Sequence, residues 1–304
     1  MNNRDGQSRL TFWATVLPPT AWVAVFFLIP LGIVWLYSFG ENKGLTEIEL
    51  SGTFANYVRA FQPLYLEIFA KSIVVAGLTT LLCLIIGFPV ALAIVFADEK
   101  SRAWLLLLVM LPFWTNLLIR TYALIAVLRT EGFANFTMEW LWNNASGLMT
   151  FAGFQPLGEF VPLQMLYNNF AVIVGLVYVH LPFMVLPLYA ALDRLDKSLM
   201  EASLDLGAGH MRTLFSIVVP LAMPGIVSGI IITFIPALGA YLTPDLLGGP
   251  DSQLIANVIE RQFKRANDWP FGAALSFLLM YATFIAIALR AYLTRGKAID
   301  AHGI

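Results

Sequence analysis

Long apolar blocks alternate with shorter polar connections along this chain of 304 residues. A helix rises about 1.5 Å per residue, so a block of about 20 apolar residues is long enough to cross a bilayer. Strand-like alternation is absent, and a helix satisfies its own backbone hydrogen bonds in lipid. We therefore predict an all-α, polytopic membrane protein with six transmembrane helices, at about Pro18–Tyr37, Ile68–Ala97, Ala103–Leu128, Phe170–Leu192, Leu221–Tyr241 and Phe271–Leu293.

The composition supports this class. Hydrophobic residues make up 59% of the chain, charged residues make up 12%, and the mean hydropathy is +0.76. A net charge of −1 argues against nucleic acid as a partner, because nucleic acid requires a basic face. The one cysteine, Cys83, lies in an apolar block and excludes an internal disulfide and a cysteine-rich metal site.

The basic residues suggest an orientation. The first block contains Pro18, Pro19 and Pro30 and is too long for a signal peptide, so we expect an uncleaved span. Placing both termini in the cytoplasm puts nine of the 18 basic residues inside, and this is the orientation that the positive-inside rule prefers. Those on the cytoplasmic side are Arg4, Arg9, Lys100, Arg102, Arg194, Lys197, Arg212, Arg295 and Lys297, whereas Arg261, Lys264 and Arg265 fall outside.

One connection, EASLDLGAGHMRTLFSIVVP, is partly charged and broken by glycine. Ser198 and Glu201 fit a capping box, which predicts a short helix beginning at Ser198. Gly207 fits a C-terminal cap. A second helix over Gly209–Pro220 would carry one apolar side, formed by Met211, Leu214, Phe215 and Val218. By pattern alone, this hairpin could equally be a simple re-entry turn.

The same stretch resembles the EAA loop of ABC importer permeases. That pattern is Glu-Ala-Ala, three residues, Gly, nine residues, Ile, one residue, Leu-Pro. Every interval matches here, with Ser203 in place of the second alanine and Val219 in place of leucine. The matching residues are Glu201, Ala202, Ser203, Gly207, Ile217, Val219 and Pro220.

The resemblance implies the type I ABC importer permease (MetI-like) fold and a coupling helix that seats on a cytoplasmic ATPase subunit. Glu201 would offer a carboxylate to a basic group of that subunit, and Gly207 would set the corner angle. Ala202, Ser203 and Ala208 complete the implied contact set. Alternatively, Glu201 would only close its capping box.

No nucleotide site is visible in the chain. The pair Gly296-Lys297 lacks the spacing of a phosphate-binding loop, so ATP would be bound by partner subunits and the chain itself would need no cofactor. His180, His210 and His302 are widely separated, which predicts neither a metal site nor catalytic residues. For His180, beside Pro182 in an apolar block, we expect a packing role.

Three further segments narrow the resemblance. Leu111–Tyr122, Gly239–Gly249 and Asp268–Ala274 look like the spermidine/putrescine branch of ABC permeases, and specifically the first of its two permease subunits. The likeness covers nearly the whole chain. It implies a homologous second permease, two ATPase subunits, a periplasmic binding protein and a place in the bacterial inner membrane.

A polyamine path would need aromatic or acidic side chains that soften desolvation of the cation. We predict Trp114, Tyr122, Tyr241 and Asp245 for this role, with Trp114 and Tyr122 two turns apart on nearly one helix face. The alternative is an interfacial aromatic belt. Arg120, near the end of the third block, is expected to snorkel to the interface.

The long connection after the third block contains aromatic residues but no apolar run long enough to span. We predict an interfacial helix around Phe133–Trp142 that supports docking of a binding protein.

Three other functions stay open. The chain could be an ABC permease for another small solute, such as an amino acid or 4-aminobutyrate. It could instead be an ion-coupled secondary transporter or channel that works without an ATPase. A membrane enzyme would require clustered catalytic residues, and the sequence shows no such cluster.

Overall fold

The computed structural model describes residues 4–44, 47–155 and 157–300, and the side chains of residues 4–11, 197, 286 and 289–300 are outside the description. The chain divides into two compact units, one formed by Met1–Leu66 with Val258–Ile304 and the other by Glu67–Asn257. Both chain ends, and the side chains of Arg4, Arg9, Lys197, Arg295 and Lys297 on which the predicted orientation partly depends, lie outside the described residues.

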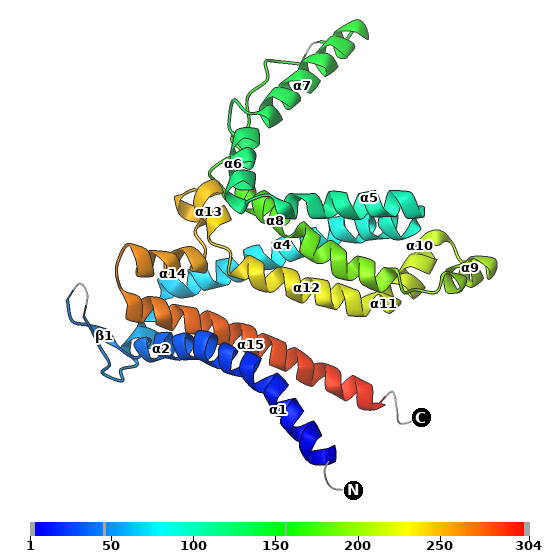
Figure 1. The fold of residues 1–304 in the computed structure, drawn as a ribbon. Coiled ribbons are helices and arrows are strands. Elements are labelled where there is room, and N and C mark those ends of the chain that lie inside the picture. Colours follow the sequence, from blue (N-terminus) through cyan, green and yellow to red (C-terminus); the bar gives the residue numbers. More distant parts are fainter. Residues whose placement is uncertain (1–3, 45–46, 156, 301–304) are drawn as a thin grey trace. The chain divides into compact units, whose positions relative to one another are not determined.

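Unit 1 is built from the two ends of the chain (Figure 1). The long C-terminal helix α15 lies beside α2 and α3. The elements of unit 1 are α1 (Arg4–Val23), the π-helical turn η1 (Ala24–Leu28), α2 (Ile29–Tyr37), the small antiparallel hairpin β1 (Glu41–Asn42) and β2 (Ile48–Glu49), α3 (Ala55–Ala60) and α15 (Trp269–Asp300).

Two contacts join these elements. Trp35 Nε1 donates to the hydroxyl of Tyr281 at 2.8 Å, which ties α2 to α15. Arg59 on α3 forms an ion pair of 2.7 Å with Asp268 and stacks over the Phe271 ring at 3.9 Å. Because Phe271 is fully buried, the start of α15 is the packed end of this unit.

Unit 2 contains most of the remaining helices. They are α4 (Pro63–Phe96, whose first turn belongs to unit 1), α5 (Glu99–Met110), the 3₁₀ turn η2 (Leu111–Trp114), α6 (Leu117–Leu128), α7 (Phe133–Phe151), α8 (Asn169–Leu192), α9 (Lys197–Asp205), α10 (His210–Thr213), the π-helical turn η3 (Leu214–Val218), α11 (Val219–Leu221), α12 (Met223–Leu238), α13 (Leu242–Leu247), the 3₁₀ turn η4 (Pro250–Ser252) and α14 (Ile255–Lys264, which continues into unit 1).

The core of unit 2 is the pair α8 and α12, with α4 against it. The helices approach closely at small residues, as membrane helices do. A Cβ on Gly225 would lie 2.4 Å from the Cβ of Ala191, and one on Gly229 would lie 2.7 Å from the sulfur of Met184. The interface is therefore set by glycines on α12.

The predicted apolar blocks are all helical, but not all are straight. Three helices are long and apolar enough to cross a membrane, namely Phe12–Tyr37, Pro63–Phe96 and Asn169–Leu192, and α15 contributes a shorter apolar stretch, Trp269–Ile285. The other two blocks belong to bent helix pairs. The described part is thus consistent with six membrane segments.

The prediction of one continuous helix over Ala103–Leu128 was wrong. The chain bends by 97° between Glu99–Trp114 and Leu117–Phe151. Thr115 and Asn116 have extended backbones, and the Asn116 side chain accepts a hydrogen bond from the N–H of Leu118, which starts a new helix. The fifth block is also shorter than predicted, because it starts after a bend of 67° at Ala222 and ends at Leu238.

Candidate functional site

The hairpin α9–α10 begins at a different cap from the predicted one. The carboxylate of Asp196 accepts a hydrogen bond of 2.9 Å from the N–H of Ser198, so Asp196 is the N-cap and the capping box of Ser198 with Glu201 was wrong. Glu201 is the fifth residue of α9, too far along to reach back to the cap. The Ser198 N–H lowers the pKa of the Asp196 carboxyl below its usual value.

The corner of the hairpin is a Schellman motif at Gly207. The N–H of Gly207 donates to the carbonyl of Leu204 at 2.9 Å, and that of Ala208 donates to Ser203 at 3.1 Å. Gly207 has φ of +82°, a left-handed conformation that costs glycine little. The prediction that this glycine forms the C-terminal cap is confirmed.

The second half of the hairpin is not one regular helix. The predicted helix over Gly209–Pro220 is α10 followed by the π-helical turn η3 and by α11. Ser203 Oγ and Thr213 Oγ1 are 2.9 Å apart and share a hydrogen bond, which clamps α9 to α10. Ser203 thus has an internal role that its position in the EAA pattern did not reveal, and Thr213 escaped the sequence analysis because no local pattern marks it.

The predicted apolar side of the second helix is divided between two environments. Val218 is buried in the unit 2 core and Leu214 packs against it, whereas the side chains of Met211 and Phe215 are 65% and 63% exposed. Leu206, at the corner, is 89% exposed. We give the name coupling face to these three exposed apolar residues and the exposed Glu201 side chain, all of which belong to the hairpin segment.

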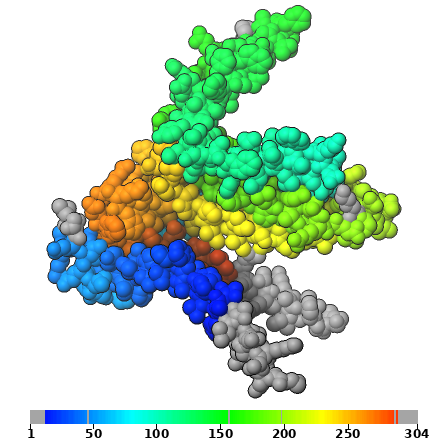
Figure 2. Space-filling model, in the orientation of Figure 1, coloured from blue at the N-terminus to red at the C-terminus, as the bar shows by residue number. Residues whose placement is uncertain are grey.

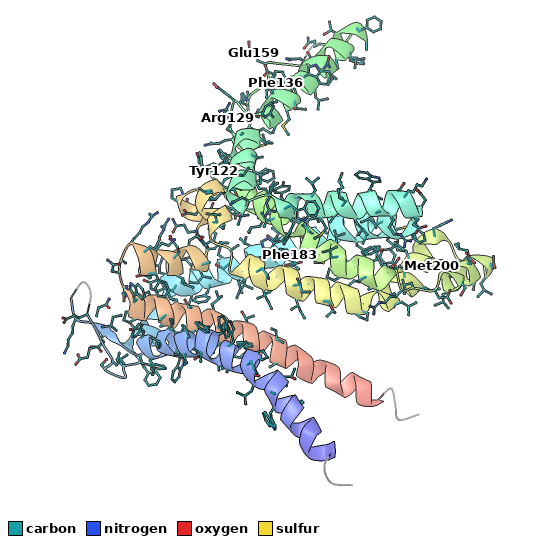
Figure 3. All side chains as sticks on the ribbon, viewed as in Figure 1. Tyr122, Arg129, Phe136, Glu159, Phe183 and Met200 are labelled. Carbon is teal, nitrogen blue, oxygen red and sulfur yellow. The ribbon has the colours of Figure 1, made fainter. Side chains whose placement is uncertain are left out.

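Behind the coupling face lies a mostly apolar pocket of about 410 Å³. Glu201 and His210 are its only charged or imidazole side chains, and Met200 on α9, labelled in Figure 3, forms part of the wall. Its lining residues are Leu92, Phe96, Met200, Glu201, Leu204, His210, Thr213, Leu214 and Val218. The hairpin therefore encloses a hollow against the end of α4, beside the contacts that Leu214 and Val218 make with the core.

An ion pair fixes the helices that lead to the hairpin. Arg102 on α5 binds Asp193, the C-cap residue of α8, at 2.9 Å and also donates to the carbonyl of Val95 on α4 at 2.9 Å. Three helix ends are held by one guanidinium.

The proposed path residues fall on different elements. Trp114 ends η2 and Tyr122 lies on α6, so the bend between them places them on separate helices, and the prediction of one shared face was wrong. Tyr241 and Asp245 lie one turn apart at the start of α13, where the N–H of Asp245 donates to the carbonyl of Tyr241 at 3.0 Å. All four side chains are exposed.

Tight packing positions α13 against α8. A Cβ on Gly175 of α8 would lie 2.4 Å from Leu247 and 2.7 Å from Thr243. Because α13 also packs against α6, the elements that carry Tyr122, Tyr241 and Asp245 share one support. These three residues therefore stand on two helices that pack against each other and against α8.

Two polar side chains inside unit 2 behave differently. His180 is buried, and its Nδ1 forms a hydrogen bond of 2.8 Å with the carbonyl of Leu176 on its own helix, so the expected packing role is confirmed. Arg120 does not snorkel as predicted, because its Nε and Nη1 atoms are buried and have no hydrogen-bond partner among the described residues.

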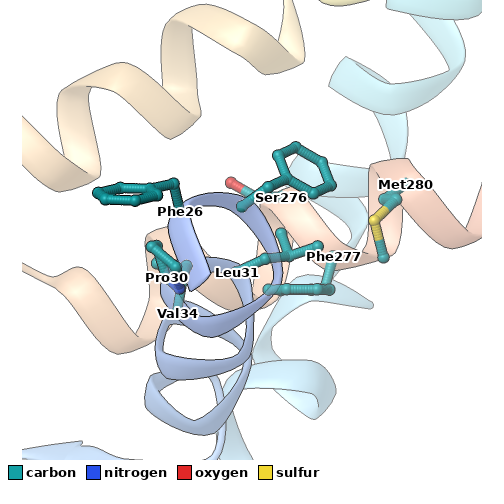
Figure 4. Close-up of a pocket in the computed structure, with 8 residues that line it drawn as sticks. Phe26, Pro30, Leu31, Val34, Ser276, Phe277 and Met280 are labelled. Atoms are coloured by element: carbon teal, nitrogen blue, oxygen red, sulfur yellow. The ribbon is translucent and has the colours of Figure 1, made fainter. Parts of the chain in front are cut away.

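Unit 1 carries a second pocket, of about 350 Å³, between its first helices and α15 (Figure 4). The one hydroxyl there, on Ser276, donates to the carbonyl of Gly272 at 2.8 Å. The pocket thus offers apolar contacts, which do not suit a charged solute. Its lining residues are Phe26, Phe27, Pro30, Leu31, Val34, Ser276, Phe277 and Met280.

These features define a multi-pass membrane protein with a capped helical hairpin after α8, and the sequence comparisons agree with this class. Residues 5–298 match the family described as binding-protein-dependent transport system inner membrane component, and the chain belongs to this family. It is thus the multi-pass inner-membrane component of such a transport system, a transport subunit and not an enzyme.

Particular relatives are more specific. The chain is 41% identical over 258 residues to the spermidine/putrescine transport system permease protein PotB of Salmonella typhimurium (strain SL1344), covering 85% of each chain. It is 40% identical to PotB of Escherichia coli (strain K12), with coverage of 85% and 88%. It is 33% identical over 303 residues to the inner membrane ABC transporter permease protein YdcU of the same organism, with coverage of 96% and 91%.

A solved structure supports the fold. A chain of a bacterial ABC transporter involved in the import of the acidic polysaccharide alginate matches with a TM-score of 0.70 at 17% identity, covering 96% of this chain and 97% of that one. At this identity the match concerns the fold alone. The predicted all-α importer permease fold is confirmed.

Proposed function

We propose that this chain is one of two homologous permease subunits in an ATP-driven importer, and that the pair forms the membrane path for polyamines delivered by a periplasmic binding protein. The observation that supports this substrate class is the identity of about two residues in five to PotB permeases across most of both chains. Spermidine and putrescine are the substrates named for those relatives.

The coupling face would be the site where a cytoplasmic ATPase subunit docks. Its exposed apolar residues Leu206, Met211 and Phe215 would be buried by the partner, and Glu201 would pair with a basic group there. Ala202 and Ala208 present small side chains, and the Schellman corner with the Ser203–Thr213 clamp makes the hairpin stiff enough to transmit a displacement. Two ATPase subunits would bind the ATP.

The polyamine path would pass the side chains that α6 and α13 carry. Aromatic rings attract ammonium groups by about 0.5–2 kcal/mol, and a carboxylate adds a charge that a polyamine can follow. Tyr122, Tyr241 and Asp245 supply both chemistries, and Trp114 stands at the bend that begins α6.

The orientation follows from the proposed docking. The α9–α10 hairpin and both termini would lie in the cytoplasm of a bacterium. The segment from α6 to α7, at the opposite end of α5, would lie at the periplasmic side, where the binding protein arrives.

Reconstituted uptake tests the substrate class. The complete complex in vesicles should take up spermidine and putrescine only with ATP and binding protein, and not basic amino acids or 4-aminobutyrate. Selective uptake of a non-cationic solute would overturn the polyamine assignment while keeping the permease. Uptake that is indifferent to ATP would instead indicate a secondary transporter.

Charge reversal tests the docking surface. Glu201→Lys should release the ATPase subunit during purification and abolish uptake, because it reverses the charge of the coupling face. Glu99→Lys is the matched control, an exposed acidic residue in the first turn of α5 near the same end of unit 2. Retention of the ATPase in the Glu201 variant would contradict the proposed contact.

A further inference from the structure

Helix α7 and the segment that returns along it form an arm of unit 2 whose two sides differ. On one side, Asn135 is buried and bonds the backbone of Leu163 twice, donating to its carbonyl at 2.9 Å and accepting from its N–H at 2.8 Å. Trp142 Nε1 donates to the carbonyl of Gly158 at 2.8 Å. This side of α7 is therefore occupied by the chain's own residues 157–163.

The other side carries large apolar side chains, which we call the α7 stripe. At 100° per residue, its members fall within a face about 120° wide. Their exposed fractions are 70% for Phe133, 69% for Phe136, 59% for Trp140, 70% for Leu148 and 91% for Phe151. The one charged residue of α7, Glu139, lies off this face.

The arm projects from the rest of unit 2. Helix α7 packs against α6, and the ribbon and space-filling views show it extending away from α5 and α8 (Figures 1 and 2). The helices α6 and α7 run at 97° to α5, which itself packs beside α8. Because α8 is long enough to cross a bilayer, an arm perpendicular to this direction runs close to the plane of the membrane.

Lipid is the partner that suits such a stripe. Phe and Trp on one face of a helix, with polar residues on the other, are typical of helices that lie in the interfacial region of a bilayer. Thr137 and Asn144 lie between the large apolar residues on the same face, and Asn143 lies at its edge, so the stripe contains polar groups that suit an interfacial position. The exposed carboxylates of Glu139 and Glu159, the latter labelled in Figure 3, belong to the part of the arm outside the stripe.

Protein partners suit it less well. A binding protein that comes and goes would leave five large apolar side chains in water between visits, and soluble surfaces avoid contiguous patches of this kind. Permanent contacts between helices inside membranes favour small residues, which allow close approach. The α7 stripe instead carries five bulky side chains, which hold a neighbouring helix at a distance.

We propose that the α7 stripe is immersed in the interface of the periplasmic leaflet, so that the arm of α7 and residues 157–163 is anchored on the membrane surface. The choice of leaflet rests on the proposed function, whereas the immersion of the stripe rests on the geometry of unit 2. The side with Glu139 and Glu159 is then turned to water.

Spin labels measure directly whether the α7 stripe is immersed in the bilayer. In a Cys83→Ala background, single cysteines would replace Phe136, Trp140 or Leu148 in the stripe, and Glu139 or Thr150 as controls off the stripe. Each labelled chain is assembled into the complete complex and reconstituted in vesicles. Accessibility is measured to oxygen, which concentrates in lipid, and to a nickel chelate, which stays in water.

The ratio of oxygen to nickel accessibility should be several-fold higher at the three stripe positions than at the two controls, and unchanged when binding protein is added. In a second outcome, the nickel chelate reaches the stripe labels in the absence of binding protein and loses access when binding protein is added. That result would overturn the proposal in favour of protein docking. Stripe labels that neither reagent reaches would show burial against another subunit and would also overturn it.

The outcome is separable from the transport assay. Accessibility does not depend on which solute is carried, so uptake of a non-polyamine would overturn the proposed function and leave the lipid contact standing. Nickel accessibility from the cytoplasmic side at the two controls would reverse the leaflet but not the immersion. Because all five substitutions are at exposed side chains, the labelled proteins are expected to fold.

Discussion

Single residues decide the shape of the α9–α10 hairpin. Gly207 has a positive φ that places the following helix, and a Cβ there would meet open space, so the cost of any side chain is conformational and not steric. Asp196 supplies the cap that begins α9. Gly207 acts through its backbone conformation and Asp196 through its carboxylate, at either end of the helix that carries Glu201.

Gly207→Ala should loosen the corner, because a left-handed conformation costs an L-residue about 1–2 kcal/mol. The expected result is roughly 5- to 30-fold faster hydrogen exchange of the Gly207 and Ala208 amides, which make the two Schellman bonds. Gly209→Ala is the matched control, since Gly209 has φ of −74° and open space around it. Equal exchange in the two variants would show that the left-handed corner does not hold the hairpin.

The N-cap that Asp196 provides for α9 should be sensitive to acid. Its pKa is lowered by the hydrogen bond from Ser198, so the stabilisation of α9 is present above the ordinary carboxyl pKa of 3.8 and is lost as the pH falls through the lowered value. A spin label at the exposed Leu199 should become more mobile between about pH 5 and about pH 2.

Asn caps helices about as well as Asp and does not titrate in this range, so Asp196→Asn should remove the pH dependence and keep the label ordered. Asp196→Ala should mobilise it at every pH. Acid-induced mobility that persists in the Asn variant would assign the effect to another group.

At the scale of elements, the structure depends on pairs that the sequence does not mark. The capping box of Ser198 and Glu201 satisfies a local rule, yet Asp196 caps the helix because the chain enters α9 two residues earlier. The third apolar block was long enough for one span, but its helix is interrupted at Thr115 and Asn116. The chain bends there by 97° into α6. Pro112 and the capping residue Asn116 were the available signals for that bend.

The clamp between α9 and α10 gives a test at this scale. Ser203→Ala and Thr213→Val each remove the shared hydrogen bond, which contributes about 1 kcal/mol. Trypsin cleavage at the exposed Arg212 should accelerate roughly fivefold in each variant, because local cleavage follows the population of the opened hairpin.

The double variant should cleave little faster than either single variant, since both lose the same bond. Ser216→Ala, which removes an exposed hydroxyl on η3, is the control and should cleave at the original rate. Multiplied effects in the double variant would show that the two hydroxyls act independently.

At the scale of the whole molecule, the proposed orientation can be tested by labelling. In a Cys83→Ala background, Ser198→Cys on α9 should react with a membrane-impermeant maleimide only in inside-out vesicles. Thr150→Cys on α7, which lies off the stripe, should react only in intact cells whose outer membrane is permeabilised. Both side chains are exposed, so accessibility reports the side of the membrane.

Reaction of both cysteines from the same side would contradict the proposed topology. Reaction of each from the wrong side would invert it. An unsubstituted Cys83 protein is the control for background labelling and should stay unlabelled, because its thiol is fully buried.

The sequence by itself determined the class of this protein and the position of its α9–α10 hairpin. Apolar blocks of membrane-spanning length, the intervals of the EAA pattern and the glycine at the corner are local properties, and neighbouring residues in the chain encode them. The end of α9 near Gly207 and the position of α7 could be predicted for the same reason.

Only the tertiary structure decided which residues meet. The pairing of Ser203 with Thr213, the ion pair of Arg102 with Asp193, the support of α13 by Gly175 and the separation of Trp114 from Tyr122 depend on how helices pack and bend. Such contacts join residues that are distant in sequence. The chain order carries no direct mark of them, because packing selects the partner by shape and hydrogen-bonding capacity after the helices have formed.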